Sequence, residues 1–403
     1  YPGNLDPDTG VTVTFSPVNF VGCLNCFDST ALGTFAGTFG NQTLRGEFFG
    51  ITADGITDDY AALTNALTVM KRTESRLELP AGVIRVTDTP KCRNESGVKR
   101  GNWTLAGAGR GTVIYQVTAG KHCLEVGSYD VGAVTSDVME GITIKDIACV
   151  GTTGTARALY LNSIARSNFE NLYLCGDDVD LYIEGCLLSS WSGIKLGYAA
   201  FNENPTSGIT LPTTRDYGLY VANNNQAYTT NVFNGLVIEG HSVGGMYVYG
   251  GSTNTYNNLT CEGEIGYGIK STSEWDVFNG VYVEGITGYA LDLENTQKVT
   301  VMSLFTNRET VYLNNASAVF VNSRADFLIG SISGPNSFYN CDGTIEYEVG
   351  TGGATETNFV SCDLYNRTHK TTIKNGKSGL STDSFSSNAP RPLCEHIIYT
   401  QKP

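Results

Sequence analysis

Apolar and polar residues alternate in short segments that recur along the chain in nearly the same form. Four segments start with an aromatic residue, pass through a turn into an alternating strand and end at glycine: Phe169–Gly176, Phe233–Gly240, Tyr256–Gly263 and Phe278–Gly285. The last three start 23 and then 22 residues apart, and weaker copies start at Phe338 and Phe359. This period is typical of one coil of a β-helix, because a propeller blade needs about 40 residues.

A second short strand with an apolar–polar–apolar pattern follows each of these segments. Because side chains on a strand alternate between its two faces, the leading aromatics are predicted to point inward. The same register places Cys149 and Cys261 inside, puts Cys341 and Cys362 in one inward column, and turns Cys175 outward. The buried thiols are expected to be free and to pack as small hydrophobic groups. The pattern therefore predicts an all-β solenoid.

A helix is predicted near residues 58–72, ahead of the first coils. Thr57 is the expected N-cap, and Leu63 and Met70 belong to an apolar stripe with helical spacing. The stretch from Leu77 to Val86 then reads as a strand, a Pro-Ala-Gly turn and a second strand.

The segment Asp54–Asp59 (DGITDD), followed by Leu79–Val86 (LPAGVIRV), resembles the entry motif of the pectate-lyase-like right-handed parallel β-helix superfamily. Leu105–Thr112 is similar to the next coil of that family, and the closest resemblance is to phage tailspike depolymerases. It implies a single-stranded right-handed parallel β-helix with an N-terminal capping helix. It also implies a homotrimer at a virion surface or outside the cell that binds and cleaves surface polysaccharide.

Three regions are predicted along the chain. Residues 1–45 read as an irregular segment containing the pair Cys23 and Cys26, and residues 46–370 read as the β-helix with its capping helix. Residues 371–403 lose the coil pattern and are expected to form a tail that covers the open end of the solenoid, whose edge would otherwise be available for pairing.

Charge and hydropathy narrow the range of partners. The 403 residues carry 26 Lys and Arg against 40 Asp and Glu, a net charge of −14. This balance argues against nucleic acid as the main partner, while a local cationic strip could still bind an anionic polysaccharide. No apolar run is long enough to span a bilayer, so membrane insertion is not expected.

Three carboxylates stand out as candidate catalytic groups. Glu239, Glu262 and Glu284 occupy the same outward position on three consecutive predicted coils. Coils stack about 4.8 Å apart, so these carboxylates should repel one another and some of their pKa values should rise. A neighbouring pair has the separation that a retaining glycosidase needs, and alternate members approach the inverting separation. The same glutamates could instead form a solvated surface or hold Ca²⁺ for uronic-acid chemistry, although no cofactor is required.

A second outward column contains Tyr182, Tyr247, Lys270 and Asp292. Tyr and Lys can bind sugars or act as acid and base in a lyase, and Asp292 is a further, weaker catalytic candidate. The coil that starts at Trp191, itself a candidate for substrate contact, contains an insertion from Tyr198 to Asp216. An insertion on a rigid solenoid is expected to shape a binding groove, to contact a neighbouring subunit or to be plain decoration.

The first hypothesis is therefore an enzyme that cleaves glycosidic bonds of a surface or capsular polysaccharide with the three glutamates. Two alternatives share the fold. One is a non-catalytic β-helix that binds glycans or builds a virion or cell surface, and the other is a polysaccharide lyase or epimerase acting on uronic acids.

Overall fold

The computed structural model describes residues 43–96, 98–128, 137–201, 209–222, 227–264, 266–330, 335–347, 357–366, 371–378 and 398–401. Its strands pair in parallel from coil to coil, and the fold is an all-β, right-handed parallel β-helix, as the sequence predicts. The chain divides into two compact units, which are taken in turn. Unit 1 comprises 1–216 with 223–227, and unit 2 comprises 217–222 with 228–403.

Unit 1 contains helix α1 (Tyr60–Thr73), the helical turn α2 (Tyr198–Phe201) and two 3-10 turns, η1 (Gly46–Phe49) and η2 (Gly109–Gly111). Its strands are β1 (Thr43–Arg45), β2 (Asp54–Asp58), β3 (Arg76–Glu78), β4 (Gly82–Val86), β5 (Lys91–Arg93), β6 (Thr104–Ala106), β7 (Thr112–Gln116), β8 (Leu124–Gly127), β9 (Met139–Glu140), β10 (Thr143–Gly151), β11 (Arg157–Ala165), β12 (Asn168–Cys175), β13 (Val179–Leu187), β14 (Ser190–Ser192) and β15 (Lys195–Gly197).

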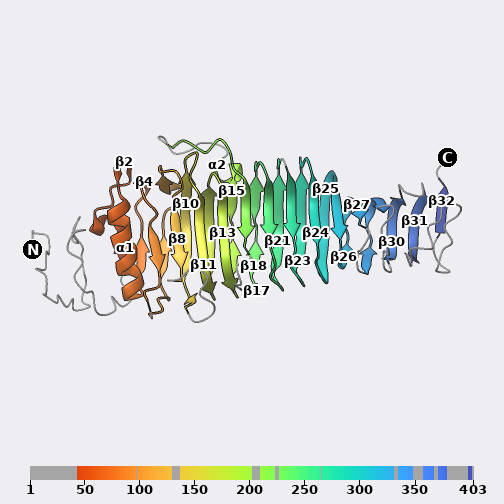
Figure 1. Cartoon of the computed structure of the whole chain (residues 1–403), viewed down its shortest axis with the longest axis horizontal. Helices are drawn as coiled ribbons and strands as arrows, with labels where there is room; N and C mark the ends of the chain where they lie inside the picture. Colours follow the sequence, from red (N-terminus) through yellow and green to blue (C-terminus); the bar gives the residue numbers. More distant parts are fainter. Residues whose placement is uncertain are drawn as a thin grey trace, which may run out of the picture. The chain divides into compact units, whose positions relative to one another are not determined.

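Helix α1 lies at the N-terminal edge of the described coils (Figure 1) and packs beside β3 and β5. Leu63 and Met70 of its apolar stripe are fully buried, as predicted. The predicted N-cap is wrong, because β2 extends to Asp58 and the helix begins two residues later than expected, with Asp59 at the N-cap position. Thr57 instead donates to the carboxylate of Asp54. The Asp59 carboxylate accepts backbone N–H bonds from the preceding loop, so it fixes the entry of the chain into the helix.

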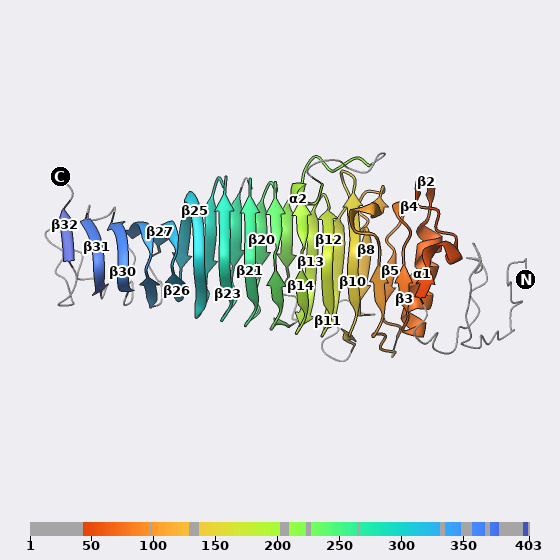
Figure 2. The same ribbon diagram turned by 180° about the vertical axis from the view of Figure 1, so that it is seen from behind.

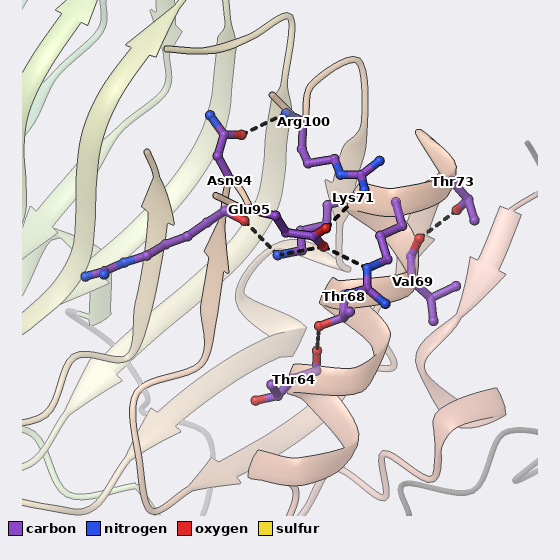
Figure 3. A network of polar contacts seen from close by, with 10 residues as sticks. Thr64, Thr68, Val69, Lys71, Thr73, Asn94, Glu95 and Arg100 are labelled. Atoms are coloured by element: carbon purple, nitrogen blue, oxygen red, sulfur yellow. Dashed lines mark hydrogen bonds and ion pairs between the residues drawn. The ribbon is translucent and has the colours of Figure 1, made fainter. Parts of the chain in front are cut away.

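The C-terminal half of α1 is tied to the loop after β5 by charged groups (Figure 3). Lys71 Nζ donates to the backbone oxygen of Arg93 at 2.7 Å, and Arg72 Nε donates to Glu95 at 2.7 Å. Arg100 contacts the other oxygen of the same carboxylate at 3.1 Å. Burial lowers the pKa of Lys71, while the carboxylate of Glu95 opposes that shift.

The insertion in the long coil covers part of the outer face of unit 1. Ala200, Phe201 and Ile209 from the insertion form one buried apolar cluster with Tyr115 and Cys175 of the coils. Cys175 is on the outer face, as the alignment indicates, but it has no exposed surface. It is buried because the insertion packs over this part of the outer face.

Unit 2 is built from coils of the same kind (Figure 2). Its strands are β16 (Tyr217–Val221), β17 (Tyr228–Thr229), β18 (Val232–Asn234), β19 (Val237–Glu239), β20 (Gly244–Val248), β21 (Thr255–Glu262), β22 (Tyr267–Ser271), β23 (Val277–Glu284), β24 (Tyr289–Glu294), β25 (Val299–Asn314), β26 (Ala318–Val321), β27 (Arg324–Ile329), β28 (Asn336–Tyr339), β29 (Asp342–Tyr347), β30 (Thr357–Asn366), β31 (Thr371–Ser378) and β32 (Ile398–Gln401).

The leading aromatics of the repeat form a stack in the interior of unit 2. The rings of Phe233 and Tyr256 are 5.2 Å apart, and those of Tyr256 and Phe278 are 4.9 Å apart, all fully buried. The turn inside each segment is a bend in the left-handed region, for example at Asn258 (φ 53°) and Gly280 (φ 67°). Asn and Gly tolerate this conformation, which explains why they recur there.

The described residues hold eight cysteines, all buried and none in a disulfide. Cys149 and Cys261 are inside, as predicted. The thiols of Cys341 and Cys362 interact with each other, which raises the pKa of Cys341 and lowers that of Cys362.

At the C-terminal end, β31 pairs antiparallel with β30, and β32 pairs antiparallel with β31. Most of the predicted tail, and Cys23 and Cys26 in the predicted N-terminal segment, lie outside the described residues. Covering of the solenoid end by the tail remains a prediction.

Candidate functional site

The three predicted glutamates lie side by side on unit 2. Glu239 pairs in register with Glu262, and Glu262 pairs in register with Glu284. A glycine in the left-handed region follows each one, with φ between 70° and 80°, and ends the strand there. All three side chains are half-buried. We call Glu239, Glu262 and Glu284 the glutamate row.

The central member of the glutamate row differs from its neighbours in its electrostatic surroundings. Burial raises the pKa of Glu262, and the negative charges of Glu239 and Glu284 raise it further. The carboxylate of Glu284 is held at both oxygens, by the hydroxyl of Tyr282 and by the side-chain amide of Asn307 at 3.2 Å. One carboxylate of the row is thus biased toward its protonated form while the next is fixed by donors.

Glu309 is a fourth carboxylate at this place, and the repeat did not reveal it. Its Oε1 accepts the backbone N–H of Gly285 at 2.8 Å, directly after the glutamate row. Its Oε2 is buried and has no hydrogen-bond partner among the described residues. Strand β25 breaks register between Phe305 and Thr310, so counting by the coil period could not align Glu309 with the row.

Aromatic side chains lie on the same face as the glutamate row, two residues earlier along the strand. Tyr282 pairs in register with Phe305, and Phe305 pairs with Arg324. The guanidinium carbon of Arg324 lies 5.8 Å from the ring centroid of Phe305. Flat apolar rings next to carboxylates are common in sugar-binding sites, because one face of a pyranose ring is apolar.

The second predicted column is also in register within unit 2. Tyr247 pairs with Lys270, and Lys270 pairs with Asp292. The ammonium of Lys270 is 3.1 Å from Asp292 and 2.8 Å from Glu294. We call Tyr247, Lys270, Asp292 and Glu294 the lysine cluster.

Two pKa shifts show how the lysine cluster is charged. Burial disfavours the ammonium of Lys270, but its hydrogen bonds to Glu294 and Asp292 outweigh burial and raise its pKa. Burial, with a further contribution from Tyr220, raises the pKa of Tyr247. Both groups therefore hold their protons at neutral pH and are poorly suited to act as a base.

The lysine cluster is surrounded by tyrosines. The ring of Tyr247 is 5.2 Å from that of Tyr220 and 6.3 Å from that of Tyr267. The ring of Tyr267 lies over Gly244, where an added Cβ would come within 2.4 Å of it. The glutamate row and the lysine cluster are on different strands, and the charges that shift the pKa of Glu262 are those of its own row.

The remaining two candidates belong to unit 1. Tyr182 is half-buried, and the guanidinium of Arg157 lies 3.4 Å from its ring centroid. Trp191 is fully buried and stacks on Phe169 at 3.9 Å. The prediction that Trp191 contacts substrate is wrong, because its place in the repeat is that of an inward-pointing aromatic.

A polar cluster in unit 1 was not predicted. Glu125, Tyr160 and Tyr182 are in register on one outer column. Tyr160 donates to Glu184, and its pKa is raised by burial and by that bond. The apolar–polar–apolar triplets around Glu125 and Tyr160 have the same form as the one around Tyr182, so sequence alignment could have found them. Glu125 and Glu184 are 2% and 4% exposed, which leaves little carboxylate surface for a substrate.

Within the described residues, no group of three or more His, Cys, Asp or Glu side chains is arranged to hold a metal ion. A bound Ca²⁺ therefore stays a prediction. None of the helices that the structure describes has the length and apolar character needed to cross a membrane.

Two of the solved structures with a similar fold are viral proteins. ORF18 of Geobacillus virus E2 matches 82% of this chain at 17% identity with a TM-score of 0.51, and the match covers 64% of the viral chain. The gp42 tailspike of Acinetobacter phage vb_AbaP_AS12 matches 87% of this chain at 9% identity with a TM-score of 0.56, over 67% of its own length. The chain has the parallel β-helix fold.

The β-helix fold is what these matches establish, because their sequence identities are low. The chain spans less than two thirds of the length of the Geobacillus virus protein. The sequence matches no protein-family model and no curated protein. The function of this β-helix must therefore be argued from its own residues.

Proposed function

We propose that the protein is a polysaccharide-degrading enzyme that hydrolyses glycosidic bonds at the glutamate row. The observation that carries the proposal is the position of Glu262, half-buried between two other carboxylates with a raised pKa. A glycosidase needs two carboxyl groups in different environments, because one must be protonated to act as the acid and the other ionised to act as the nucleophile.

Each member of the row has a separate role in this proposal. Glu262 retains its proton and donates it to the leaving oxygen of the glycosidic bond. Glu284, oriented by Tyr282 and Asn307, attacks the anomeric carbon as the glycosidic bond breaks. Water then hydrolyses the glycosyl–Glu284 ester, and Glu262, now deprotonated, accepts the proton of that water. Neighbouring coils are about 4.8 Å apart, close to the separation in retaining enzymes, so cleavage should retain the anomeric configuration. Glu239 contributes the charge that keeps Glu262 protonated.

The aromatic face beside the row would bind the sugar chain. Tyr282 and Phe305 offer flat apolar surface, and Arg324 adds a positive charge in a chain that carries a net charge of −14. Substrate would then run from coil to coil along the row. A tailspike-like location on a virion or cell surface, and assembly as a homotrimer, belong to the same proposal and are supported by the shared fold.

Elimination by a lyase or epimerase is the less favoured chemistry. It needs a base that removes the proton next to the uronate carboxylate, and the raised pKa values of Lys270 and Tyr247 oppose that role. Asp292 is 6% exposed and paired with Lys270, so we assign it to holding the ammonium in place. The lysine cluster with its tyrosines is better suited to binding sugars.

The test is to incubate the protein with a panel of capsular polysaccharides and to identify the products by mass spectrometry. Hydrolysis adds one water per cleavage, whereas elimination leaves an unsaturated end that absorbs in the near ultraviolet. Glu262→Gln and Glu284→Gln should each lower kcat at least 100-fold, while Asp292→Asn should retain most of it. Glycan binding with no product would favour the non-catalytic alternative, and full activity of both glutamine variants would exclude the glutamate row.

A further inference from the structure

An exposed tryptophan stands at the other end of strand β23 from Glu284. Trp275 is 48% exposed, whereas Trp103 and Trp191 are 1% and 0% exposed. Its backbone N–H donates to the oxygen of Gln297 on the next coil at 2.9 Å. The left-handed conformation of Trp275 recurs at the matching turn residue Lys298, so this conformation is a property of the coil and not of the tryptophan. The unusual feature is an indole held in solvent at this turn.

Lys298 connects Trp275 to a groove on the neighbouring coils. Its ammonium lies 3.9 Å from the indole centroid. The groove has a volume of about 340 Å³. Its polar lining includes Asn295, Gln297, Lys298, Asn315 and Ser317, and we call it, with Trp275, the tryptophan groove.

The floor of the tryptophan groove contains a polar atom without a partner. Thr296 lines the groove and is 1% exposed, and its hydroxyl forms no hydrogen bond with any described residue. Because this hydroxyl oxygen has almost no accessible surface, it makes the base of the groove polar and is not itself a contact for a ligand. Asn315 donates to the amide oxygen of Asn295 at 2.8 Å, which holds both side chains in place at the rim. The amide oxygen of Asn315 and the amide nitrogen of Asn295 can then bind hydroxyl groups of a ligand.

We propose that the tryptophan groove is a second sugar-binding site, which takes one acidic sugar unit, such as a uronic acid residue of a polysaccharide. The indole would pack against the apolar face of the ring, and the amides would bind its hydroxyl groups. The ammonium of Lys298 would pair with the sugar carboxylate, for which the described groove supplies no competing anion. The volume is at the lower end of the range for ligand sites and fits a short unit.

This site is distinct from the glutamate row and breaks no bond. Trp275 precedes β23 and Glu284 ends it, so the eight residues of the strand, with the bend at Gly280, separate them. The proposal therefore does not depend on hydrolysis at the glutamate row, and it also holds for a protein that only binds glycans. For a polymer-cleaving enzyme, such a site would hold the chain while the row cuts elsewhere.

The experiment uses the fact that Trp275 is the one solvent-exposed tryptophan of three, all of which lie in the described part of the chain. The full chain is titrated with trigalacturonate and, separately, with the neutral trisaccharide maltotriose, while tryptophan fluorescence and acrylamide quenching are followed. Trigalacturonate should change the emission in a saturable way and protect Trp275 from quenching. It should bind about five- to tenfold more tightly than maltotriose at low salt, and added salt should reduce that preference.

Three variants separate this site from the catalytic proposal, with binding measured by calorimetry. Trp275→Phe should weaken trigalacturonate binding about tenfold, and Lys298→Met should remove the preference for the acidic sugar. Glu262→Gln should leave binding at the groove unchanged even if it abolishes cleavage. An unsaturable fluorescence signal with both sugars, or equal affinity of wild type and Trp275→Phe, would overturn the site. Equal affinity for the two sugars would overturn its assignment to acidic units.

Discussion

The rings of Tyr282 and Phe305 lie face to face on neighbouring coils, with centroids 5.8 Å apart and planes inclined by 2°. Phe305 is 39% exposed, and the hydroxyl of Tyr282 reaches the carboxylate of Glu284. The pair therefore presents an apolar surface next to the proposed nucleophile.

If this surface binds the sugar chain, Phe305→Ala should raise KM about three- to tenfold and change kcat little, because aromatic stacking contributes about 0.5–1.5 kcal/mol. Steady-state kinetics on a defined oligosaccharide would measure both constants. Tyr339→Ala is the matched control, since Tyr339 is similarly exposed at 40% but is in register with Val321, in a different column from the row. A similar rise in KM for both variants would contradict a specific role for Phe305.

The raised pKa of Glu262 predicts the alkaline side of the pH–rate profile. A general acid works only while protonated, so kcat should fall as the pH rises through the pKa of Glu262 in the complex. Part of that elevation comes from the charge of Glu239. Glu239→Gln removes this charge, lowers the pKa of Glu262 and should move the alkaline limb to lower pH while preserving activity in acid.

Tyr339→Ala again serves as the control, because it should leave the pH profile in place. Loss of activity of Glu239→Gln at every pH would show that Glu239 itself takes part in bond cleavage, contrary to the role proposed for it. An unmoved alkaline limb would show that another group is the acid.

The fold could be predicted because each coil repeats the same local rules. An inward aromatic, a residue that accepts a left-handed bend and an alternating strand recur with a fixed period, so the register of Glu239, Glu262 and Glu284 follows by counting. Prediction from the repeat pattern was wrong where local hydrogen bonds interrupt the repeat. The start of α1 shifted because Thr57 bonds to Asp54 within β2 rather than capping the helix.

The surroundings of the site could be predicted less well. Glu309 comes close to the row through a register break in β25, which leaves no periodic signal. The burial of Cys175 depends on an insertion whose packing has no repeat to follow. Trp191 is a different case, because its register with Phe169 already indicates an inward position.

The cover over Cys175 can be tested through the reactivity of that thiol. Phe201 is 4% exposed in the apolar cluster of the insertion. Phe201→Ala should expose Cys175 to iodoacetamide, as measured by peptide mapping, and should cost about 3 kcal/mol of unfolding free energy. Cys149 inside the coils should stay protected. Leu188→Ala, at an apolar residue that is 50% exposed, should change neither quantity. Unchanged labelling of Cys175 in Phe201→Ala would show that Phe201 does not hold the cover.

A buried aspartate should make the stability of unit 2 depend on pH. Asp276 has no exposed surface, and burial raises its pKa from the ordinary value of 3.8 to about 6. One oxygen accepts two bonds from Asn254, through its backbone N–H at 2.8 Å and its side-chain amide at 3.1 Å. The other accepts the hydroxyl of Ser273 at 2.5 Å. These bonds reduce the pKa shift caused by burial without cancelling it.

The sign of the effect follows from the raised pKa. The folded protein holds the proton of Asp276 more tightly than the unfolded chain, so this contribution to stability is full below about pH 4 and is lost as the pH rises to about 6. The loss should be about 3 kcal/mol, because each pKa unit corresponds to about 1.4 kcal/mol.

Asp276→Asn keeps the shape and both acceptor bonds from Asn254, and its amide can donate to Ser273. Its free energy of unfolding in urea should therefore exceed that of the wild type at pH 8 and match it at pH 4. Asp342→Asn, at an exposed site, should not change this pH dependence. Parallel stability curves for wild type and Asp276→Asn across this range would show that Asp276 does not titrate between the two pH values.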